Sequence, residues 1–363
     1  MKLSRLSNKH ICLALIPDET QEKMLLWGEM LSANGIDYCN LIVPCARHSE
    51  NAWSRYPTLA GGRVVRSQID LNRHWTPKHT AVVLQSPYLE DYPDWFWAEK
   101  VTNHNLEFIY TGYGIALSNW NAGHYRLPSF KLVDKLGVTD VLAYVGAFIH
   151  QPLKARLIPD PQARLLSNSP SSRKPEHTLL WAPHWSQNWF GNSRGYSRFK
   201  ESLIPITNFL RNNPEKTLTF RPHPILKEAL NCLTANVNPA SEEERVTLDS
   251  VKNLEIQYSD FISLPNVALS RSSLVDDILN HQNLITDGVS IIAYWGLTGK
   301  PMVVWRDSDS PGFNSLGSLL NLFLTKVKSQ EELTLFMKQD NIEWRSRIST
   351  SALQGLLRLV LVA

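Results

Sequence analysis

Short apolar runs alternate with longer helical patterns along most of this chain, and this alternation limits the fold more than any other feature of the sequence. Apolar runs of about four to eight residues bounded by turn residues are typical of buried strands. Helices between such strands allow the strands to lie parallel in one sheet. Residues 284–305, LITDGVSIIAYWGLTGKPMVVW, show the pattern compactly, as an apolar run, a polar turn, a helix and a second apolar run. The sequence therefore predicts an α/β fold with parallel sheets.

The predicted elements form two series. In the first, strands are predicted at 11–17, 38–44, 80–87 and 106–114, and helices at 19–34 and 93–104, while 136–148 has no clear assignment. In the second, strands are predicted at 177–185, 216–224, 267–270, 284–287 and 301–305, and helices at 196–212, 273–281 and 290–298, with further helical patterns at 327–338 and 344–361. Residues 151–176 lie between the series, are rich in Pro, Ser and Arg, and predict a linker.

The length of the chain agrees with two domains, because 363 residues is about twice the usual domain size. Two α/β series joined by a linker predict twin Rossmann-like domains facing a cleft, with boundaries at 1–165 and 166–363. The tail helix in 344–361 is expected to pack across both domains. In such sheets ligands bind outside the carboxyl ends of the strands, so polar residues at strand ends are the candidates for a site.

Composition excludes several classes of protein. A net charge of +3 without a dense run of Lys or Arg argues against a nucleic-acid partner. The four cysteines lie far apart in the sequence without a CxxC pair, which argues against a metal site or disulfide framework and favours reduced thiols. No apolar run approaches about 18 residues, so no transmembrane helix is expected. The N-terminal run ends at Pro17 without a cleavage pattern and predicts a strand rather than a signal peptide, which predicts a cytoplasmic protein.

The turn at Asp287, Gly288 and Ser290 joins a predicted strand to a predicted helix. Backbone N–H groups at a helix N-terminus, together with a serine hydroxyl, form an anion site, and glycine leaves room for close approach of a ligand. Asp and Ser are also favoured as ordinary helix caps. The turn alone leaves both alternatives open.

Two histidines follow predicted strands of the second series. Arg221 and His223 belong to RPHP, whose prolines stiffen the turn and fix the direction of the imidazole. A histidine can donate to a phosphate oxygen or transfer a proton near neutral pH, and an arginine can pair with a diphosphate. An ordinary surface turn is the alternative. His184, in WAPHW, holds the same strand-end position. In the first series Gln85 and the segment YTGYG, with Tyr113 and Gly114, also end strands, with a plain βα turn as the alternative.

Taken in order, the clusters of the second series resemble the CDP-glycerol glycerophosphotransferase family of teichoic-acid and capsule biosynthesis. The similar segments are LLWAPHW, a helix beginning near Tyr196, TFRPHPIL, LPN at 264–266, LITDGVS, TGKPMVV and Phe313-Asn314. They span about residues 177–320, with fainter similarity in VVLQSPYLEDYP and FIYTGYG. The resemblance implies a GT-B fold, in which the second of two Rossmann-like domains holds most of the nucleotide donor.

The resemblance also implies transfer of glycerol phosphate from CDP-glycerol to an acceptor hydroxyl, with release of CMP. It implies His223 and His184 as catalytic residues, Arg221, Asp287, Gly288, Ser290 and Lys300 as donor- or diphosphate-binding residues, and Gln85, Tyr113 and Gly114 on the acceptor side. The acceptor would be a polysaccharide or a lipid-linked glycan, and a lipid-linked acceptor would bring the protein to the inner face of the cell membrane. Beyond the nucleotide-linked donor, the resemblance implies neither a metal nor a cofactor.

Two departures from the family pattern keep other functions open. YTGYG has no histidine where teichoic-acid members carry a histidine before Gly-Thr, so the general base is unassigned. Tyr294 stands where related members have an acid suited to ribose hydroxyls. The alternatives are a GT-B glycosyltransferase that uses a nucleotide sugar and a degenerate, non-catalytic GT-B module. A sugar-nucleotide 2-epimerase has a similar turn, but this chain lacks its second glycine and the acids after Ser290.

Overall fold

The computed structural model divides into two compact units, each built on one parallel sheet. Unit 1 comprises residues 1–167, 314–316 and 358–363, and unit 2 comprises residues 168–313 and 317–357. The structure describes residues 9–15, 21–43, 63–64, 80–112, 114–119, 125–169, 177–186, 195–223, 226–227, 230, 242–308, 310–338 and 346–361. Among these, no helix is both long and apolar enough to cross a membrane.

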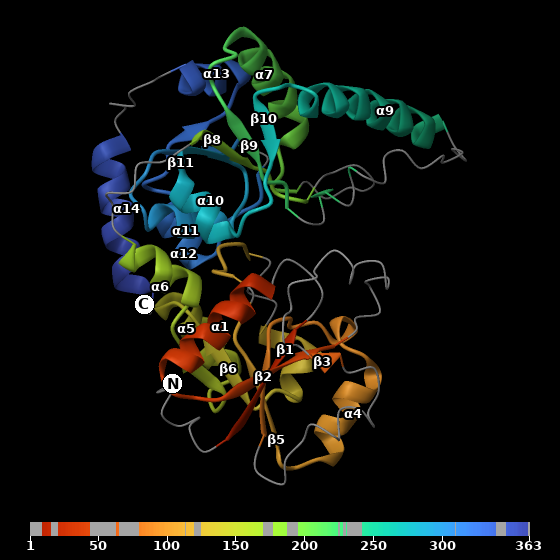
Figure 1. The fold of residues 1–363 in the computed structure, drawn as a ribbon, viewed down its shortest axis with the longest axis vertical. Helices are drawn as coiled ribbons and strands as arrows, with labels where there is room; N and C mark the ends of the chain where they lie inside the picture. The colour runs from red at the N-terminus through yellow and green to blue at the C-terminus, as the bar shows by residue number, and fades with distance from the viewer. Residues whose placement is uncertain are drawn as a thin grey trace. The chain divides into compact units, whose positions relative to one another are not determined.

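Unit 1 contains a seven-stranded sheet in the order β3-β2-β1-β4-β5-β6-β7. Five of its strands, β1, β2, β3, β5 and β6, are labelled in Figure 1. Its strands are β1 (His10–Leu15), β2 (Tyr38–Ile42), β3 (Arg63–Val64), β4 (Thr80–Leu84), β5 (Leu106–Tyr110), β6 (Lys135–Val138) and β7 (Ala155–Leu157), and its helices include α1 (Gln21–Ala33), α4 (Asp94–Thr102), α5 (Val141–His150) and α6 (Pro161–Asn168). Successive side chains of a strand point to opposite faces. Ala14 and Val82 therefore contribute to one core, and Leu13 and Val83 to the core on the other face.

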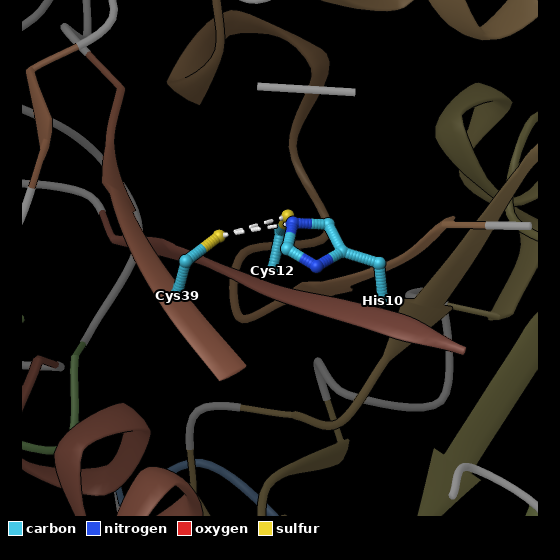
Figure 2. Close-up of side chains that lie close together, drawn as sticks. All are labelled: His10, Cys12 and Cys39. Carbon is cyan, nitrogen blue, oxygen red and sulfur yellow. Dashed lines mark hydrogen bonds between the residues drawn. The ribbon is translucent and has the colours of Figure 1, made fainter. Parts of the chain in front are cut away.

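The register of β1 and β2 places distant residues side by side. Cys12 is paired with Cys39, and parallel neighbours in register point to the same face of the sheet. His10 lies two residues before Cys12 and so shares that face, and Figure 2 shows the three side chains together. This cluster lies toward the amino ends of both strands.

Unit 2 contains a six-stranded sheet in the order β10-β9-β8-β11-β12-β13. Its strands are β8 (His177–Ala182), β9 (Leu218–Phe220), β10 (Val267–Leu269), β11 (His281–Thr286), β12 (Met302–Trp305) and β13 (Lys326–Val327). The helices of this half are α7 (Phe199–Asn212), α9 (Glu242–Ile262), α10 (Leu274–Asn280), α11 (Ser290–Gly296), α12 (Ser315–Leu320), α13 (Gln330–Lys338) and α14 (Ser346–Val360). Trp181 is buried at the centre of the core, with its ring 5.0–5.3 Å from those of Phe199, Phe220 and Phe261.

Both sheets reverse their strand order at one point, between β1 and β4 in unit 1 and between β8 and β11 in unit 2. At such a switch point the connections after two adjacent strands leave toward opposite faces of the sheet, which makes room for a ligand outside the carboxyl ends. In unit 2 the last residues of these strands, Ala182 and Thr286, are paired in register. Polar residues directly after them are therefore held close together.

The predicted α/β fold with parallel sheets is confirmed. Residues 136–148, which had no clear assignment, divide into β6 and α5 because the Asp140 carboxylate accepts the amide of Ala143 at 2.7 Å and begins the helix. The predicted linker is wrong at 155–168, which forms β7 and α6. Asp160 accepts the amide of Ala163 at 3.0 Å, so the Pro-rich sequence starts a helix there. Residues 170–176 lie outside the described residues.

The main boundary between the units follows Ser167, whereas the sequence predicted domains 1–165 and 166–363, with the boundary after residue 165. The tail helix α14 belongs to unit 2 as far as Leu357, and the Gln354 side chain donates to the Leu297 carbonyl at 2.7 Å. Residues 358–363 belong to unit 1, where Leu361 forms an isolated bridge with Asp140. The last residues of the chain thus contribute to the unit that the first residues begin.

Candidate functional site

The loops after β8 and β9 run side by side at the carboxyl end of the unit 2 sheet. The Arg221 amide donates to the Trp181 carbonyl at 2.8 Å, and the His223 amide donates to the Pro183 carbonyl at 3.3 Å. Backbone hydrogen bonds between these two segments thus continue past the ends of β8 and β9. As a result, the ring centroids of His184 and His223 lie 5.7 Å apart. The structure brings together two histidines that lie 39 residues apart in the sequence (223 minus 184).

Both imidazoles are half-buried and neutral near neutral pH. Burial lowers the pKa of His184 to about 4. Burial also lowers the pKa of His223 to about 3, with smaller contributions from His184 and from the charge of Arg221. Desolvation acts in this direction because it penalises the charged form of the ring. A neutral imidazole has one N–H donor and one acceptor nitrogen, so each ring can donate to a phosphate oxygen or accept a proton.

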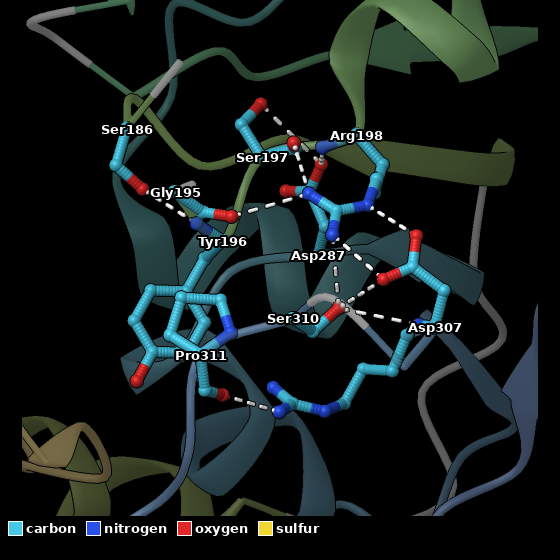
Figure 3. Close-up of polar contacts among 10 residues, drawn as sticks. Ser186, Gly195, Tyr196, Ser197, Arg198, Asp287, Asp307, Ser310 and Pro311 are labelled. Atoms are coloured by element: carbon cyan, nitrogen blue, oxygen red, sulfur yellow. Dashed lines mark hydrogen bonds and ion pairs between the residues drawn. The ribbon is translucent and has the colours of Figure 1, made fainter. Parts of the chain in front are cut away.

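Ser186 fixes the orientation of His184. The Ser186 amide donates to His184 Nδ1 at 3.2 Å, and the Ser186 hydroxyl lies 2.7 Å from the same nitrogen. Since an amide can only donate, Nδ1 is the acceptor and Nε2 carries the proton. The same hydroxyl accepts the Tyr196 amide at 2.8 Å (Figure 3). A Cβ on Gly195 would lie 1.7 Å from the Ser186 carbonyl oxygen, so this close approach requires glycine.

Asp287 follows β11, and its carboxylate faces backbone amides of the protein. It accepts hydrogen bonds from the amides of His184 and Arg198. The Ser197 hydroxyl donates to it at 3.5 Å, and Figure 3 shows Ser197 and Arg198 beside it. Burial raises the pKa of Asp287 to about 7, although the amide donors and Arg198 act to lower it. Asp287 therefore fastens the loop after β8 and the start of α7 to the end of β11. This is a positioning arrangement, in contrast to the direct diphosphate contact that the resemblance implied.

A partly buried ion pair supports the same loop, and the sequence patterns did not predict it. The Arg198 guanidinium forms a bidentate pair with Asp307, with Nε and Nη2 each 2.7 Å from a carboxylate oxygen. Its Nη1 donates to the carbonyls of Gly195 and Ser197 (Figure 3). Asp307 comes shortly after β12, so the strand-end criterion that selected Asp287 would also have selected it. Arg198 follows no strand, and nothing local in the sequence marks it.

Gly288 and Ser290 form the turn into α11. The Gly288 amide donates to Thr286 Oγ1 at 2.8 Å, and that hydroxyl donates to the Ala182 carbonyl at 2.6 Å, which links the ends of β11 and β8. A Cβ on Gly288 would lie 3.0 Å from Thr286 Oγ1. Among the described residues, no side-chain hydrogen bond caps α11. The helix-capping alternative for Asp287 and Ser290 is therefore not observed.

Arg221 lies beside the histidines but is paired with an acid. Its Nη1 is 2.8 Å from Asp277 Oδ2 and 2.8 Å from the Ser272 carbonyl oxygen. The charge of Arg221 still reaches His223, because it contributes to the lowered pKa of that ring. An anion between the two residues would meet both the guanidinium charge and the imidazole donor.

Lys300 lies apart from this cluster. It comes before β12, at the amino end of the sheet, whereas the histidines follow the carboxyl ends of their strands. Its ammonium donates to the carbonyls of Ile278, Leu279 and His281 at 2.8–2.9 Å. Because an ammonium has three donors, these bonds use all of them. The structure does not bring Lys300 to the donor-binding residues with which the resemblance grouped it.

The acceptor-side candidates lie in unit 1. Gln85 directly follows β4, at the switch point, and only 1% of it is exposed. Neither the oxygen nor the nitrogen of its side-chain amide has a hydrogen-bond partner among the described residues, whereas its backbone amide donates to the Tyr92 hydroxyl at 3.2 Å. Gly114 is half-buried in the bend after β5, and the preceding Gly112 has a left-handed backbone with φ of 73°. Tyr113 lies outside the described residues.

Comparison with known proteins gives a fold but no family. No family model matches the sequence, and no curated protein matches it. Among solved structures, the wall teichoic acid polymerase TagF aligns with 98% of this chain and 85% of its own, at 12% identity and a TM-score of 0.59.

Two further structures contain uridine nucleotides. MnaA of S. aureus with UDP aligns over 94% of this chain and 90% of its own, at 11% identity and a TM-score of 0.52. The UDP-GlcNAc 2-epimerase of Methanocaldococcus jannaschii, in complex with UDP-GlcNAc and UDP, aligns over 96% and 99%, at 9% identity and a TM-score of 0.53. At these identities the likeness concerns the fold, which is GT-B-like, with two Rossmann-like units.

Proposed function

We propose that this protein is a GT-B transferase that moves a group from a nucleotide-linked donor to an acceptor hydroxyl, and that the group is glycerol phosphate from CDP-glycerol. The observation that carries the proposal is the pair of neutral imidazoles, His184 and His223, beside the Gly288 turn at the switch point of unit 2. TagF, the polymerase whose fold this chain shares, was also studied with CDPG, which supports the choice of donor.

In this proposal the donor diphosphate lies against the two imidazoles and the turn from Gly288 to Ser290. Negative charge next to a histidine raises its pKa, so donor binding would move one or both rings toward the imidazolium form. An imidazolium that donates a hydrogen bond to the transferred phosphoryl group stabilises the negative charge that develops in the transition state. Arg221 adds positive charge on the side of His223, while Asp287 and Ser186 keep His184 in place.

The acceptor is proposed to be a polysaccharide or a lipid-linked glycan that reaches Gln85 and the bend at Gly114 in unit 1. A buried amide without a partner is costly, and a sugar or glycerol hydroxyl can satisfy both its donor and its acceptor. This division assigns charge recognition to unit 2 and hydroxyl recognition to unit 1. No metal or further cofactor is part of the proposal.

For a lipid-linked acceptor we propose contact with the membrane surface through α5. The apolar side chains of Val141, Val145, Phe148 and Ile149 lie on one face of this helix and are 42–70% exposed. Phe148→Ser with Ile149→Ser should reduce co-sedimentation with anionic vesicles. The matched control is Val101→Ser, because Val101 is an exposed apolar residue on another helix of the same unit. Equal binding by both variants would contradict this contact.

The donor is tested by incubating the purified protein with CDP-glycerol and with UDP- and GDP-sugars, and by measuring the nucleotide released. Release of CMP from CDP-glycerol is expected. Release only from a nucleotide sugar would instead support a glycosyltransferase. Absence of binding to CDP-glycerol, CMP and every nucleotide sugar in calorimetry would support a non-catalytic module.

A second measurement tests the role of the histidines directly. Calorimetric binding of CDP-glycerol at pH 6, in buffers of different ionisation enthalpy, should show net proton uptake because the bound diphosphate raises the histidine pKa values. The uptake should fall in His223→Asn and remain in His104→Asn, which changes an exposed histidine of unit 1. Binding without proton uptake would contradict the proposed contact.

A further inference from the structure

Outside the proposed donor site, the structure gathers three side chains that commonly bind metal ions. Cys39 Sγ lies 3.0 Å from Cys12 Sγ and 3.7 Å from His10 Nε2, and all three donor atoms lie within 4.8 Å of one another (Figure 2). Each comes from a paired strand, β1 or β2, so the backbone fixes their relative positions. Spacing along the sequence concealed the group, because Cys12 and Cys39 become neighbours only when the strands pair.

We propose that His10, Cys12 and Cys39 bind one thiophilic metal ion, and that this ion is principally Zn²⁺. Two thiolates and one imidazole are a common donor set for Zn²⁺. With Zn–S bonds of about 2.3 Å and Zn–N bonds of about 2.0 Å, tetrahedral geometry places two sulfurs about 3.8 Å apart and a sulfur and nitrogen about 3.5 Å apart. The Cys39–His10 distance of 3.7 Å is close to that value. The sulfurs need to separate by under about 1 Å, which side-chain rotation allows.

The exposure of the three residues gives the ion a route of entry. Cys12 is fully buried, whereas His10 and Cys39 are partly exposed. An ion can therefore approach from the His10 and Cys39 side, and a water or an external ligand can complete its coordination. Binding converts two thiols to thiolates and releases two protons, with no electron transferred. The doubly positive ion offsets the charge of the two thiolates, of which that of Cys12 is buried.

The site is separate from the proposed chemistry. His10 and Cys39 lie toward the amino ends of β1 and β2, whereas Gln85 follows the carboxyl end of β4 in the same sheet. An ion at the amino ends would tie β1 to β2 and stabilise unit 1 without contacting the transferred group. The inference therefore does not depend on the identity of the donor.

A disulfide between Cys12 and Cys39 is the competing chemistry. A disulfide would form between the two cysteines alone, with no role for His10, and its formation requires an oxidant. Mass spectrometry of peptides from protein alkylated without reduction distinguishes the two, because a linked Cys12–Cys39 peptide as the main species would overturn the metal assignment.

The decisive experiment uses the full-length protein, reduced and freed of metal, and titrated with Co²⁺ as a spectroscopic probe and then with Zn²⁺. One equivalent of Co²⁺ should produce a thiolate-to-cobalt charge-transfer band and tetrahedral d–d bands, and Zn²⁺ should abolish both. Cys39→Ser should lose the charge-transfer band, and His10→Gln should shift the d–d bands. The partly exposed positions make both variants suitable for folding checks by circular dichroism. Cys45→Ser with Cys232→Ser should retain them.

The inference is overturned if folded wild-type protein shows no charge-transfer band, or if the band survives in Cys39→Ser. The thermal midpoint provides a second readout. Zn²⁺ should raise it in the wild-type protein and leave it unchanged in folded Cys39→Ser, because a ligand that binds only the native state stabilises that state. Donor turnover measured with and without Zn²⁺ should be equal, so failure of this site and failure of the proposed function remain distinguishable.

Discussion

The switch points of the two units share a topology and differ in chemistry. Each lies where the order of a parallel sheet reverses, and each carries a buried polar residue directly after a strand, Gln85 in unit 1 and Asp287 in unit 2. The Asp287 carboxylate is held by backbone amides, and two imidazoles with lowered pKa values lie nearby. The side-chain amide of Gln85 is neutral and without a partner among the described residues. Strand order thus supplies the position, and the residues after the strands decide whether the site suits a charged or an uncharged ligand.

The largest effect should come from removing an imidazole in unit 2. We expect His223→Ala to reduce kcat by at least about 100-fold, the scale of a lost proton-transfer or hydrogen-bonding group, while the fold is retained. Release of CMP from CDP-glycerol measures the loss, and circular dichroism checks the fold. His104→Ala is the matched control in unit 1, where the ring is exposed. Full activity of His223→Ala would break the proposed contrast between the units.

The next largest effect concerns the carboxylate that joins the loops. In Asp287→Asn an NH₂ group would face an amide donor of His184 or Arg198, and we expect a loss of about 1–3 kcal/mol in unfolding free energy. Urea unfolding measures it. Asp134→Asn is the comparison in unit 1. That carboxylate accepts the Phe108 amide at 2.7 Å and pairs with Lys100 at 2.6 Å, but its side chain is 40% exposed, so water can replace these bonds. A smaller loss in Asp287→Asn than in Asp134→Asn would argue against the positioning role.

Acid should weaken unit 2 through its histidines. Their folded pKa values of about 4 and about 3 lie below the ordinary 6.5, so the unfolded state binds more protons and their stabilising contribution is lost as pH falls from about 6.5. Asp287, with a pKa raised to about 7, acts oppositely, since its contribution is present at low pH and is lost as pH rises through 7. Between pH 6.5 and pH 4.5 the two histidines lose more stability than the one carboxylate gains, so the net stability of unit 2 should fall. Hydrogen exchange near β8 and β9 should therefore rise between pH 6.5 and pH 4.5, after correction for intrinsic rates, and the rise should shrink in His184→Asn with His223→Asn.

A smaller effect is expected at the turn into α11. Ser290→Ala should weaken binding of CDP-glycerol by about 1–2 kcal/mol, the scale of one hydrogen bond to a charged group. Isothermal calorimetry measures the change, and the thermal midpoint should stay constant because Val289, and not Ser290, is the N-cap residue of α11. Unchanged affinity would limit the diphosphate contact to the backbone and the imidazoles.

The smallest effect on stability is expected at Gln85. Gln85→Met replaces an unpartnered buried amide with an apolar group of similar size, so unfolding free energy should stay within about 1 kcal/mol of wild type or increase. The KM for the acceptor should rise while the affinity for the donor is unchanged. A large loss of stability would show that the amide has a partner in the fold, and the hydroxyl-binding role would then lose its support.

Local patterns predicted the strands well and long-range pairs poorly. The apolar residues in β1, β4, β8 and β11 are buried, as expected for strands whose apolar side chains are removed from water. The Arg198–Asp307 pair joins residues 109 positions apart, and no local pattern encodes such a contact. Lys300 was grouped with the donor site by its order in a motif, but order along the chain does not specify which end of the sheet a residue occupies.

The placement of the fourth strand of each sheet has a consequence for synthesis on the ribosome. β8 lies between β9 and β11, and β1 lies between β2 and β4, so each first strand has a bare edge until its later neighbour emerges. In unit 2 this unpaired edge belongs to β8, which ends at residue 182, and its neighbour β11 begins only at residue 281. The exposed strand carries Leu179, Leu180 and Trp181. Unpaired apolar edges recruit other chains. Nascent chains stalled before β11 should therefore be the species of this protein most dependent on chaperones.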